Sequence, residues 1–147
     1  MGSLILPESG AVYVDAQVLI YTVERFPTYI DALLPLWQAS KTGQLEIVTS
    51  ELSVLEVMVG PIRTGNQRLI NSYERLLTGT EIRLIPIDVT VLANAAKLRA
   101  QTSLRTPDAI HAATASLANC NTFVTNDLGF RSLQSFNVQI LRDIVGA

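Results

Sequence analysis

Short apolar runs alternate with longer amphipathic segments along this chain. Five runs are short and rich in β-branched residues, which is typical of strands buried on both faces of a sheet. They cover residues 11–14, 47–49, 83–87, 122–125 and 138–141. Six longer segments have apolar residues three and four positions apart, a spacing that predicts amphipathic helices. They cover residues 18–23, 29–39, 52–59, 69–77, 91–98 and 110–117.

The alternation of strands and helices predicts an α/β fold. We expect a Rossmann-like three-layer sandwich, in which helices flank a mostly parallel central sheet of about five strands. The chain of 147 residues has neither a linker nor a repeat, so we expect one domain over residues 1–147. Pro35 predicts a kink or break near Leu34. Thr106 and Pro107 fit an N-cap followed by proline at the first helical position.

Composition narrows the cellular setting. Although 48% of the residues are hydrophobic, no apolar stretch approaches the roughly 20 residues that a membrane-spanning helix needs. The first ten residues do not resemble a secretory signal. Cys120 is the single cysteine, which excludes an internal disulfide and a multi-cysteine zinc site and is typical of a reducing compartment. We therefore expect a soluble, cytoplasmic protein with no membrane partner.

Four carboxylates occupy positions that suggest chemistry. Asp15 and Asp127 each close a predicted strand, whereas Asp108 lies in the first turn of a predicted helix and Glu56 about a turn and a half into another. Ligands of open α/β sheets bind outside the carboxyl ends of the strands, where these four side chains can meet. Their charges would repel unless a divalent cation lay between them. Oxygen ligands suit Mg²⁺ or Mn²⁺, so the pattern predicts a metal site acting on a phosphodiester.

Each carboxylate also has a structural interpretation. An aspartate at a helix start, such as Asp15 or Asp108, stabilises the helix through capping and the helix dipole. Asp127 fits a turn. Glu56 is harder to explain in this way because its helix is largely apolar and an unpaired buried carboxylate is costly. The combination favours a shared site over four separate structural roles.

The formal net charge of −2 argues against nucleic-acid binding through a broadly basic surface. Nine of the eleven basic residues are arginine, and the planar guanidinium suits phosphate oxygens. Any nucleic-acid contact is therefore expected to be local. Arg105 and Arg131 flank two of the acidic segments and can either contact phosphates or pair with a cluster acid. Asn126, beside Asp127, is a further candidate for substrate binding.

Four segments carry the acids in chain order. They are Val-Asp-Ala-Gln-Val-Leu-Ile-Tyr at 14–21, Thr-Ser-Glu-Leu-Ser-Val-Leu-Glu at 49–56, Arg-Thr-Pro-Asp-Ala-Ile-His-Ala-Ala-Thr-Ala at 105–115 and Phe-Val-Thr-Asn-Asp at 123–127. Together they resemble the PIN-domain nucleases, and among these the VapC-like ribonuclease toxins of bacterial toxin–antitoxin pairs. The resemblance covers nearly the whole chain.

The resemblance implies a PIN fold with endoribonuclease activity. It implies that Asp15, Glu56, Asp108 and Asp127 bind Mg²⁺ or Mn²⁺ and that the substrate is single-stranded or looped RNA. It further implies a cognate antitoxin as partner and a homodimer. The aromatic residues of the early helical segments, Phe26, Tyr29 and Trp37, are candidates for core or subunit contacts.

One position departs from the family pattern. Ala16 stands where the family often has serine or threonine directly after its first aspartate, so a hydroxyl that could support metal or substrate is missing. This leaves open an alternative, a catalytically weak or inactive PIN-fold module that binds RNA or protein. A nucleotide-binding Rossmann protein is disfavoured because no glycine-rich turn follows Val14.

His111 is the only histidine and lies three residues after Asp108, on the same helix face. It could act as a base or ligand, or be a partly buried polar neighbour in a helix interface. The second interpretation is favoured because a metal-bound water needs no histidine to become a nucleophile.

Overall fold

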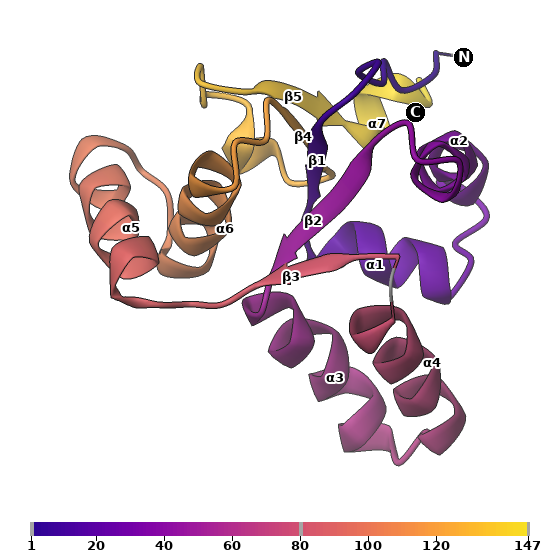
Figure 1. Cartoon of the computed structure of the whole chain (residues 1–147). Coiled ribbons are helices and arrows are strands. Elements are labelled where there is room, and N and C mark those ends of the chain that lie inside the picture. Colours follow the sequence, from indigo (N-terminus) through magenta and orange to yellow (C-terminus); the bar gives the residue numbers. More distant parts are fainter. Residues whose placement is uncertain (1, 80, 147) are drawn as a thin grey trace.

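The structure is a computed structural model that describes residues 2–79 and 81–146. Its centre is a five-stranded parallel sheet with the strand order β3-β2-β1-β4-β5 (Figure 1). The strands are β1 (Ala11–Val14), β2 (Glu46–Ser50), β3 (Arg83–Ile85), β4 (Thr122–Thr125) and β5 (Asn137–Ile140). The predicted α/β fold is confirmed, and every strand of the sheet is parallel rather than most of them.

Helices lie on both faces of the sheet. They are α1 (Ala16–Val23), α2 (Ile30–Lys41), α3 (Leu52–Thr64), α4 (Gln67–Thr78), α5 (Val89–Gln101), α6 (Thr106–Leu117), the short 3₁₀ helix η1 (Leu128–Phe130) and α7 (Leu141–Ile144). Helices α5 and α6 cover one face, and α1 and α2 lie on the other (Figure 1). In the described part of the chain no helix is both long and apolar enough to span a bilayer.

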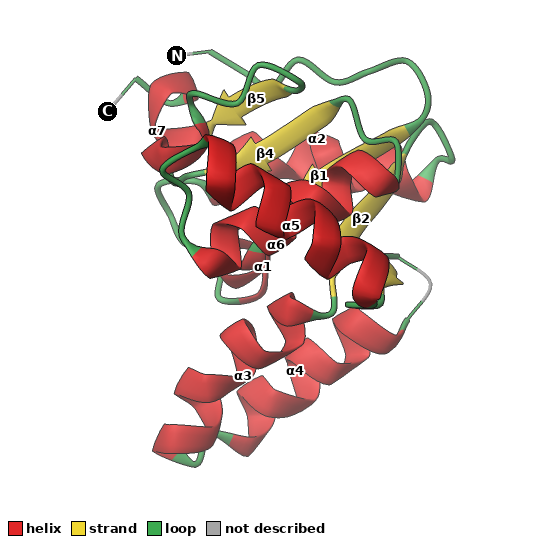
Figure 2. Ribbon diagram, turned by 90° about the vertical axis from the view of Figure 1, so that its left-hand side faces the viewer, coloured by secondary structure: helices red, strands yellow, loops and turns green. Residues whose placement is uncertain are grey.

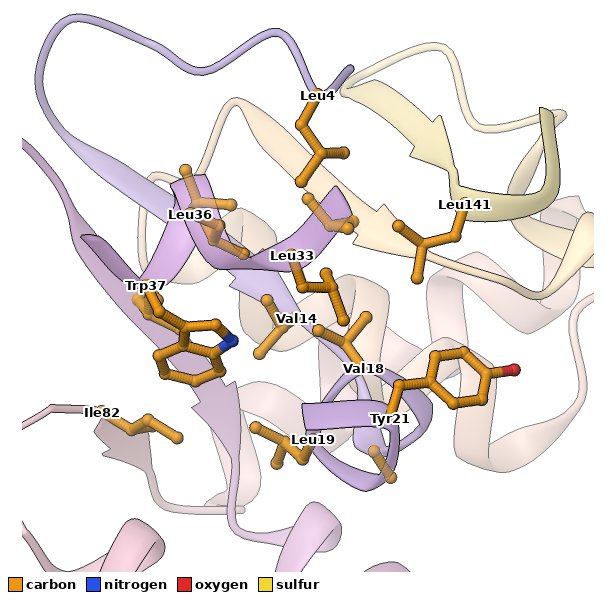
Figure 3. Packing of buried hydrophobic residues seen from close by; sticks show 14 of the residues in the cluster. Leu4, Val14, Val18, Leu19, Tyr21, Leu33, Leu36, Trp37, Ile82 and Leu141 are labelled. Atoms are coloured by element: carbon orange, nitrogen blue, oxygen red, sulfur yellow. The ribbon is translucent and has the colours of Figure 1, made fainter. Parts of the chain in front are cut away.

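Alternation along β1 divides the core into two halves. Val12 and Val14 belong to the apolar cluster shared with α1, α2 and α7, where Figure 3 shows Val14 among Leu33, Val18 and their neighbours. Tyr13 belongs to the opposite cluster, with Phe123 and the inner side of α6. Successive side chains of a strand point to opposite faces, so β1 contributes to both cores. Tyr13 thereby lies on the α6 side of the sheet.

Helices α3 and α4 form a hairpin that projects from the carboxyl edge of the sheet (Figure 2). The turn between them uses Gly65 in the left-handed region, with φ of 68°, a common way to end a helix. The hydroxyl of Tyr73 on α4 donates to Oε2 of Glu24 at 2.5 Å. Because Glu24 directly follows α1, this bond ties the hairpin to the body of the domain.

Three local predictions are wrong. Helix α2 runs unbroken past Pro35, because Leu33, Leu36 and Trp37 are buried against the core on either side of the proline. Helix α3 continues through Gly60 and Pro61 to Thr64 rather than stopping at residue 59. Helix α6 begins at Thr106, so Arg105 is its N-cap and Pro107 lies one position further into the helix than predicted.

The aromatic side chains near α1 and α2 are only partly on the surface. Trp37 is 7% exposed and its indole Nε1 donates to Oγ1 of Thr22 at 2.9 Å. Tyr29 is half-buried and its ring is tilted against that of Tyr21 with the centroids 4.7 Å apart, whereas Phe26 is 41% exposed. Trp37 therefore makes core contacts, and Phe26 alone of the three is exposed.

Candidate metal centre

The two central strands deliver two of the predicted carboxylates to one edge of the sheet. β1 and β4 are paired, with Val14 opposite Val124, and Asp15 and Asp127 follow these strands within a few residues. Asp15 caps α1, since Oδ1 accepts the N–H of Val18 at 3.3 Å. Asp127 caps η1, since Oδ1 accepts the N–H of Gly129 at 2.8 Å. The structural roles weighed from the sequence are thus real, and they coexist with convergence at the sheet edge.

Helices α3 and α6 supply the other two carboxylates. A small pocket of about 100 Å³ lies at the carboxyl edge of the sheet. Its lining consists of Asp15, Ala16, Gln17, Glu56, Asp108, His111 and Asp127. The structure therefore brings all four predicted acids to one place. A larger open hollow of about 580 Å³ lies at the opposite end of the strands, and Glu46 is its one ionisable lining residue. The pocket at the carboxyl edge therefore has the more ionisable lining of the two.

Asp15 is the most deeply buried of the four acids. It is 6% exposed, and its Oδ2 accepts the hydroxyl of Thr125 at 2.5 Å. The same hydroxyl oxygen accepts the N–H of Asp127 at 3.0 Å, so Thr125 joins the two carboxylate segments. Burial raises the pKa of Asp15 to about 6, even though the bond from Thr125 and the nearby His111 lower it. The site thus makes an ionised Asp15 unfavourable without a compensating positive charge.

Asp108 responds to the charges of its neighbours. Burial raises the pKa of the Asp108 carboxyl, and the negative charges of Asp127 and Glu56 raise it further. Arg105 and His111 act in the opposite direction. Glu56 also raises the pKa of Asp15. The carboxylates are therefore close enough to repel one another, which is the condition that a bound cation relieves.

His111 bridges the sheet and Glu56. It is 3% exposed, and its Nε2 lies 2.6 Å from Oε1 of Glu56. Its Nδ1 lies 2.5 Å from the hydroxyl oxygen of Tyr13, which also accepts the N–H of Ser50 at 3.1 Å. The sequence-based expectation of a partly buried polar neighbour underestimated these contacts, because His111 links β1 and α6 directly to one of the four acids.

The donor atoms of the pocket suit a hard divalent cation. Carboxylate oxygens are the ligands that Mg²⁺ and Mn²⁺ prefer, and such ions keep several of their waters. Among residues 2–79 and 81–146, no group of three His, Cys, Asp or Glu side chains is already arranged to hold a metal ion. The carboxylates of the pocket fit such an ion in their chemistry and lie together at one edge of the sheet.

The three candidates for substrate binding lie outside the pocket lining. Asn126 is buried, its amide donates to the hydroxyl of Tyr21 at 3.1 Å, and its oxygen accepts the N–H of Arg142 at 2.9 Å. Arg131 pairs with Asp143 at 2.7 Å on the surface. Arg105 is exposed and close enough to Asp108 to affect its pKa. Arg105 is therefore the one of the three that stands beside the carboxylates.

Several residues at the site were not singled out from the sequence. Thr125 donates to Asp15, Tyr13 contacts His111, which in turn contacts Glu56, and Gln17 lines the pocket. Thr125 could have been found because its hydroxyl lies two residues before Asp127 at a strand end. Tyr13 carried a weaker signal, namely that a tyrosine buried in a strand needs a partner for its hydroxyl.

Comparison with known proteins agrees with this architecture. The profile of the PIN domain matches residues 12–135. Comparison with curated proteins gives no match. Among solved structures, the chain is similar to a toxin–antitoxin complex from Klebsiella pneumoniae, with a TM-score of 0.67 and 23% identity over 87% of this chain and 95% of that one.

Two VapBC structures are similar at lower identity. VapBC2 from Rickettsia felis, bound to a DNA fragment from its promoter, gives a TM-score of 0.71 and 16% identity over 88% of this chain and 98% of that one. DNA-bound VapBC from Salmonella typhimurium gives a TM-score of 0.69 and 17% identity over 89% of this chain and 98% of that one. The chain belongs to the PIN domain family, whose members are nucleases.

Proposed function

We propose that this protein is a metal-dependent endoribonuclease that uses Mg²⁺ or Mn²⁺ and acts as the toxin of a type II toxin–antitoxin module. The observation that carries this proposal is the convergence of Asp15, Glu56, Asp108 and Asp127 on one pocket at the carboxyl edge of the sheet. Four acids from four separate elements have no common structural purpose. A cation gives them one, because it offsets their mutual repulsion.

We assign the carboxylates to cation binding and the nearby arginines to phosphate binding. The four carboxylates would hold the cation, with Asp15 kept in place by Thr125 and Glu56 by His111. When bound, the ion would supply a water of lowered pKa and polarise the phosphoryl oxygen under attack. Arg105, exposed beside Asp108, would bind a phosphate oxygen of the RNA. Arg131 could assist only after leaving Asp143, which costs little for a surface pair.

The resemblance to the PIN-domain ribonucleases favours RNA as the substrate. The net charge of the chain affects how RNA binds. The net charge of −2 includes the four acids of the pocket. One divalent cation brings the formal total to zero, with nine acidic and eleven basic residues outside the pocket. RNA binding should therefore depend on the metal and fall with salt.

Purified protein incubated with a total RNA pool tests this proposal directly. We expect cleavage in Mg²⁺ or Mn²⁺, none in chelator, and loss of at least about 100-fold in Asp15→Asn and Asp108→Asn, since each removes a metal ligand. Arg63→Gln, on the exposed end of α3, serves as a matched surface control and should cleave normally. Undiminished cleavage in both aspartate variants would contradict the four-acid mechanism.

An inhibitory protein partner is part of the proposal. The similar solved structures are toxin–antitoxin complexes, which supports a cognate antitoxin for this chain. An antitoxin segment with arginine or lysine could occupy the acidic pocket and replace the cation. Expression of this chain alone should arrest bacterial growth, and co-expression of the antitoxin or the Asp108→Asn substitution should restore it. Growth arrest by the Asp108→Asn variant would mean that toxicity does not depend on the carboxylates of the pocket.

We also propose that the protein works in the cytoplasm as a homodimer. Exposed apolar side chains on α3, Leu55, Val59 and Ile62, provide surface for a second copy. Light scattering of the purified chain should give twice the mass calculated from the sequence. A monomer at micromolar concentration would remove this part of the proposal.

The alternative is a PIN-fold module that binds RNA or protein but cleaves weakly or not at all. Ala16 lines the pocket and is 7% exposed, so the hydroxyl that many relatives place there is absent from the wall of this pocket. Metal titration with binding and cleavage followed in parallel decides between the two. RNA binding without product over the full range of Mn²⁺ would favour the alternative.

A further inference from the structure

A buried chain of hydrogen bonds leads from the middle of the sheet to Glu56. The N–H of Ser50, at the end of β2, donates to the hydroxyl oxygen of Tyr13 at 3.1 Å. That oxygen lies 2.5 Å from Nδ1 of His111, and Nε2 of the same ring lies 2.6 Å from Oε1 of Glu56. Tyr13 and His111 are 0% and 3% exposed, so the bond between them is shielded from water, whereas the side chain of Glu56 is 30% exposed.

With a neutral imidazole at His111, the chemistry of the groups gives this chain one direction. A backbone N–H can only donate, so the Tyr13 oxygen is an acceptor toward Ser50 and has one proton of its own to give. Burial raises the pKa of Tyr13 well above its usual value, which keeps that proton on the phenol. The proton then points to Nδ1 of His111, and a neutral imidazole that accepts at Nδ1 carries its proton on Nε2. Nε2–H donates to Oε1 of Glu56.

We propose that Tyr13 and His111 are positioning residues that fix Glu56 as a ligand for the cation. Tyr13 and Glu56 together favour one tautomer of His111, and His111 holds one oxygen of Glu56 while the other would remain available to the cation. The inference rests on the proposed function of the pocket. Partners of this kind orient metal ligands and strengthen binding. Packing alone does not require it, since an apolar side chain would fill the same space without a directed bond.

This chain of hydrogen bonds, which we call the relay, joins residues from three separate elements of the fold. Tyr13 comes from β1, His111 from α6 and Glu56 from α3. Helix α3 begins the hairpin that projects from the sheet (Figure 2). The bond to His111 therefore anchors Glu56 to the rigid centre of the domain, although its helix extends away from that centre.

The tautomer can be measured without metal or substrate. His111 is the only histidine, so a long-range ¹H–¹⁵N spectrum of labelled protein in chelator contains one imidazole. We expect one protonated nitrogen, Nε2, and one unprotonated nitrogen, Nδ1, at neutral pH. In Tyr13→Phe, which removes the donor to Nδ1, the Nδ1 resonance should shift while Nε2 keeps its proton, because the carboxylate of Glu56 can only accept. A proton on Nδ1, or on both nitrogens, in the wild-type protein would overturn the relay.

Two amide substitutions test the positioning role. The amide nitrogen of His111→Gln reaches about as far as Nε2 and can still donate to Glu56, whereas that of His111→Asn reaches only about as far as Nδ1. We expect Mn²⁺ affinity, measured calorimetrically, to fall about 10–100-fold in His111→Asn and to stay within about threefold of wild type in His111→Gln. Equal affinities in the two variants would remove the positioning role.

The controls separate this inference from the function on which it rests. In a Glu56→Gln background, His111→Asn should cause no further loss of Mn²⁺ affinity, because its effect acts through Glu56. If His111→Asn does not fold, Tyr13→Phe replaces it in the affinity measurement and should weaken binding in the same direction. No Mn²⁺ binding by the wild-type protein would overturn the proposed function itself. If the wild-type protein binds Mn²⁺ and the two His111 variants bind it with equal affinity, only the relay would be overturned.

Discussion

The hydroxyl of Thr125 donates to Oδ2 of Asp15 at 2.5 Å across the junction of two neighbouring strands. The same oxygen accepts the N–H of Asp127 at 3.0 Å, so its proton is committed to Asp15. One side chain at the end of β4 therefore orients the acid that follows β1 and the backbone of the acid that follows β4. The geometry of the pocket depends on this contact as much as on the acids themselves.

Thr125→Val should weaken metal binding while leaving the fold intact. It removes the donor to Asp15 and the acceptor for the N–H of Asp127, which should destabilise the protein by about 1–3 kcal/mol. Mn²⁺ affinity should fall about 10–100-fold, as titration calorimetry can show. Thr125→Ser keeps the hydroxyl and is the control. Equal affinity in the valine and serine variants would mean that Thr125 does not orient Asp15.

The stability of the metal-free protein should depend on pH through Asp15. Its pKa is about 6 in the fold and about 3.9 in an unfolded chain. Since the folded pKa is the higher one, the protonated form stabilises the fold; this contribution is complete below about pH 4 and is lost as pH rises through about 6. In chelator, the free energy of unfolding should fall by about 3 kcal/mol more in wild type than in Asp15→Asn between about pH 3 and about pH 7.

Urea titrations at a series of pH values measure this difference. Parallel pH profiles for wild type and Asp15→Asn would contradict the burial of an ionisable Asp15. With saturating Mn²⁺ the difference should shrink, because the cation favours the ionised carboxylate and competes with the proton.

Asp108→Asn should raise stability without metal and abolish stabilisation by metal. The repulsion from Asp127 and Glu56 that raises the pKa of Asp108 is lost when Asn replaces the carboxylate. In chelator the variant should therefore unfold at a higher urea concentration than wild type. At free Mn²⁺ about 100 times the dissociation constant, wild type should gain about 2.7 kcal/mol. The variant should gain nothing measurable, and an equal gain would exclude Asp108 as a ligand.

Tyr73→Phe should loosen the α3–α4 hairpin. The hydroxyl of Tyr73 donates to Oε2 of Glu24 at 2.5 Å, and its loss should cost about 1–2 kcal/mol. Amide hydrogen exchange should accelerate within α3 and α4 more than in the sheet. Tyr21→Phe, at a hydroxyl that accepts from Asn126 and not from the hairpin, is a matched control and should leave the hairpin unchanged. Uniform acceleration across the domain would mean that the bond does not specifically anchor the hairpin.

Ala16→Ser tests what the unusual position after Asp15 does to activity. Ala16 lines the pocket, and a serine there would add a hydroxyl beside the carboxylates. If the wild-type enzyme is limited by this missing group, cleavage of RNA should rise several-fold, up to about tenfold. Gln17→Ala, at the next residue of the same wall, controls for general changes in the pocket. Unchanged cleavage in Ala16→Ser would show that the alanine does not limit the reaction.

The sequence predicted the sheet and the meeting of the acids because both follow from local patterns. The β-branched run at 122–125 and the run at 11–14 have the bounds of β4 and β1 in the structure, and parallel strands necessarily share a carboxyl edge. Asp15 and Asp127 could be placed there by that rule alone. Glu56 stood out because its helix is otherwise apolar.

Other features depend on packing between distant segments. Tyr13 and His111 lie 98 positions apart, and their contact arises only because β1 lies under α6. The break expected at Pro35 is absent because the buried side chains around it hold α2 together. The apolar spacing over residues 52–59 predicts a shorter α3, yet the helix continues through the buried Pro61 to Thr64. Local propensity was outweighed by tertiary contacts in each case.

Crystals grown with Mn²⁺ and measured by anomalous diffraction give the most direct test of the central claim. The account predicts an anomalous peak in the pocket, with carboxylate oxygens of Asp15 and Asp108 at about 2.0–2.3 Å from the ion and Glu56 still bonded to His111. Crystals of Asp108→Asn, prepared identically, should lack the peak. Wild-type crystals with no peak among the four acids, at Mn²⁺ concentrations that support cleavage, would contradict the account.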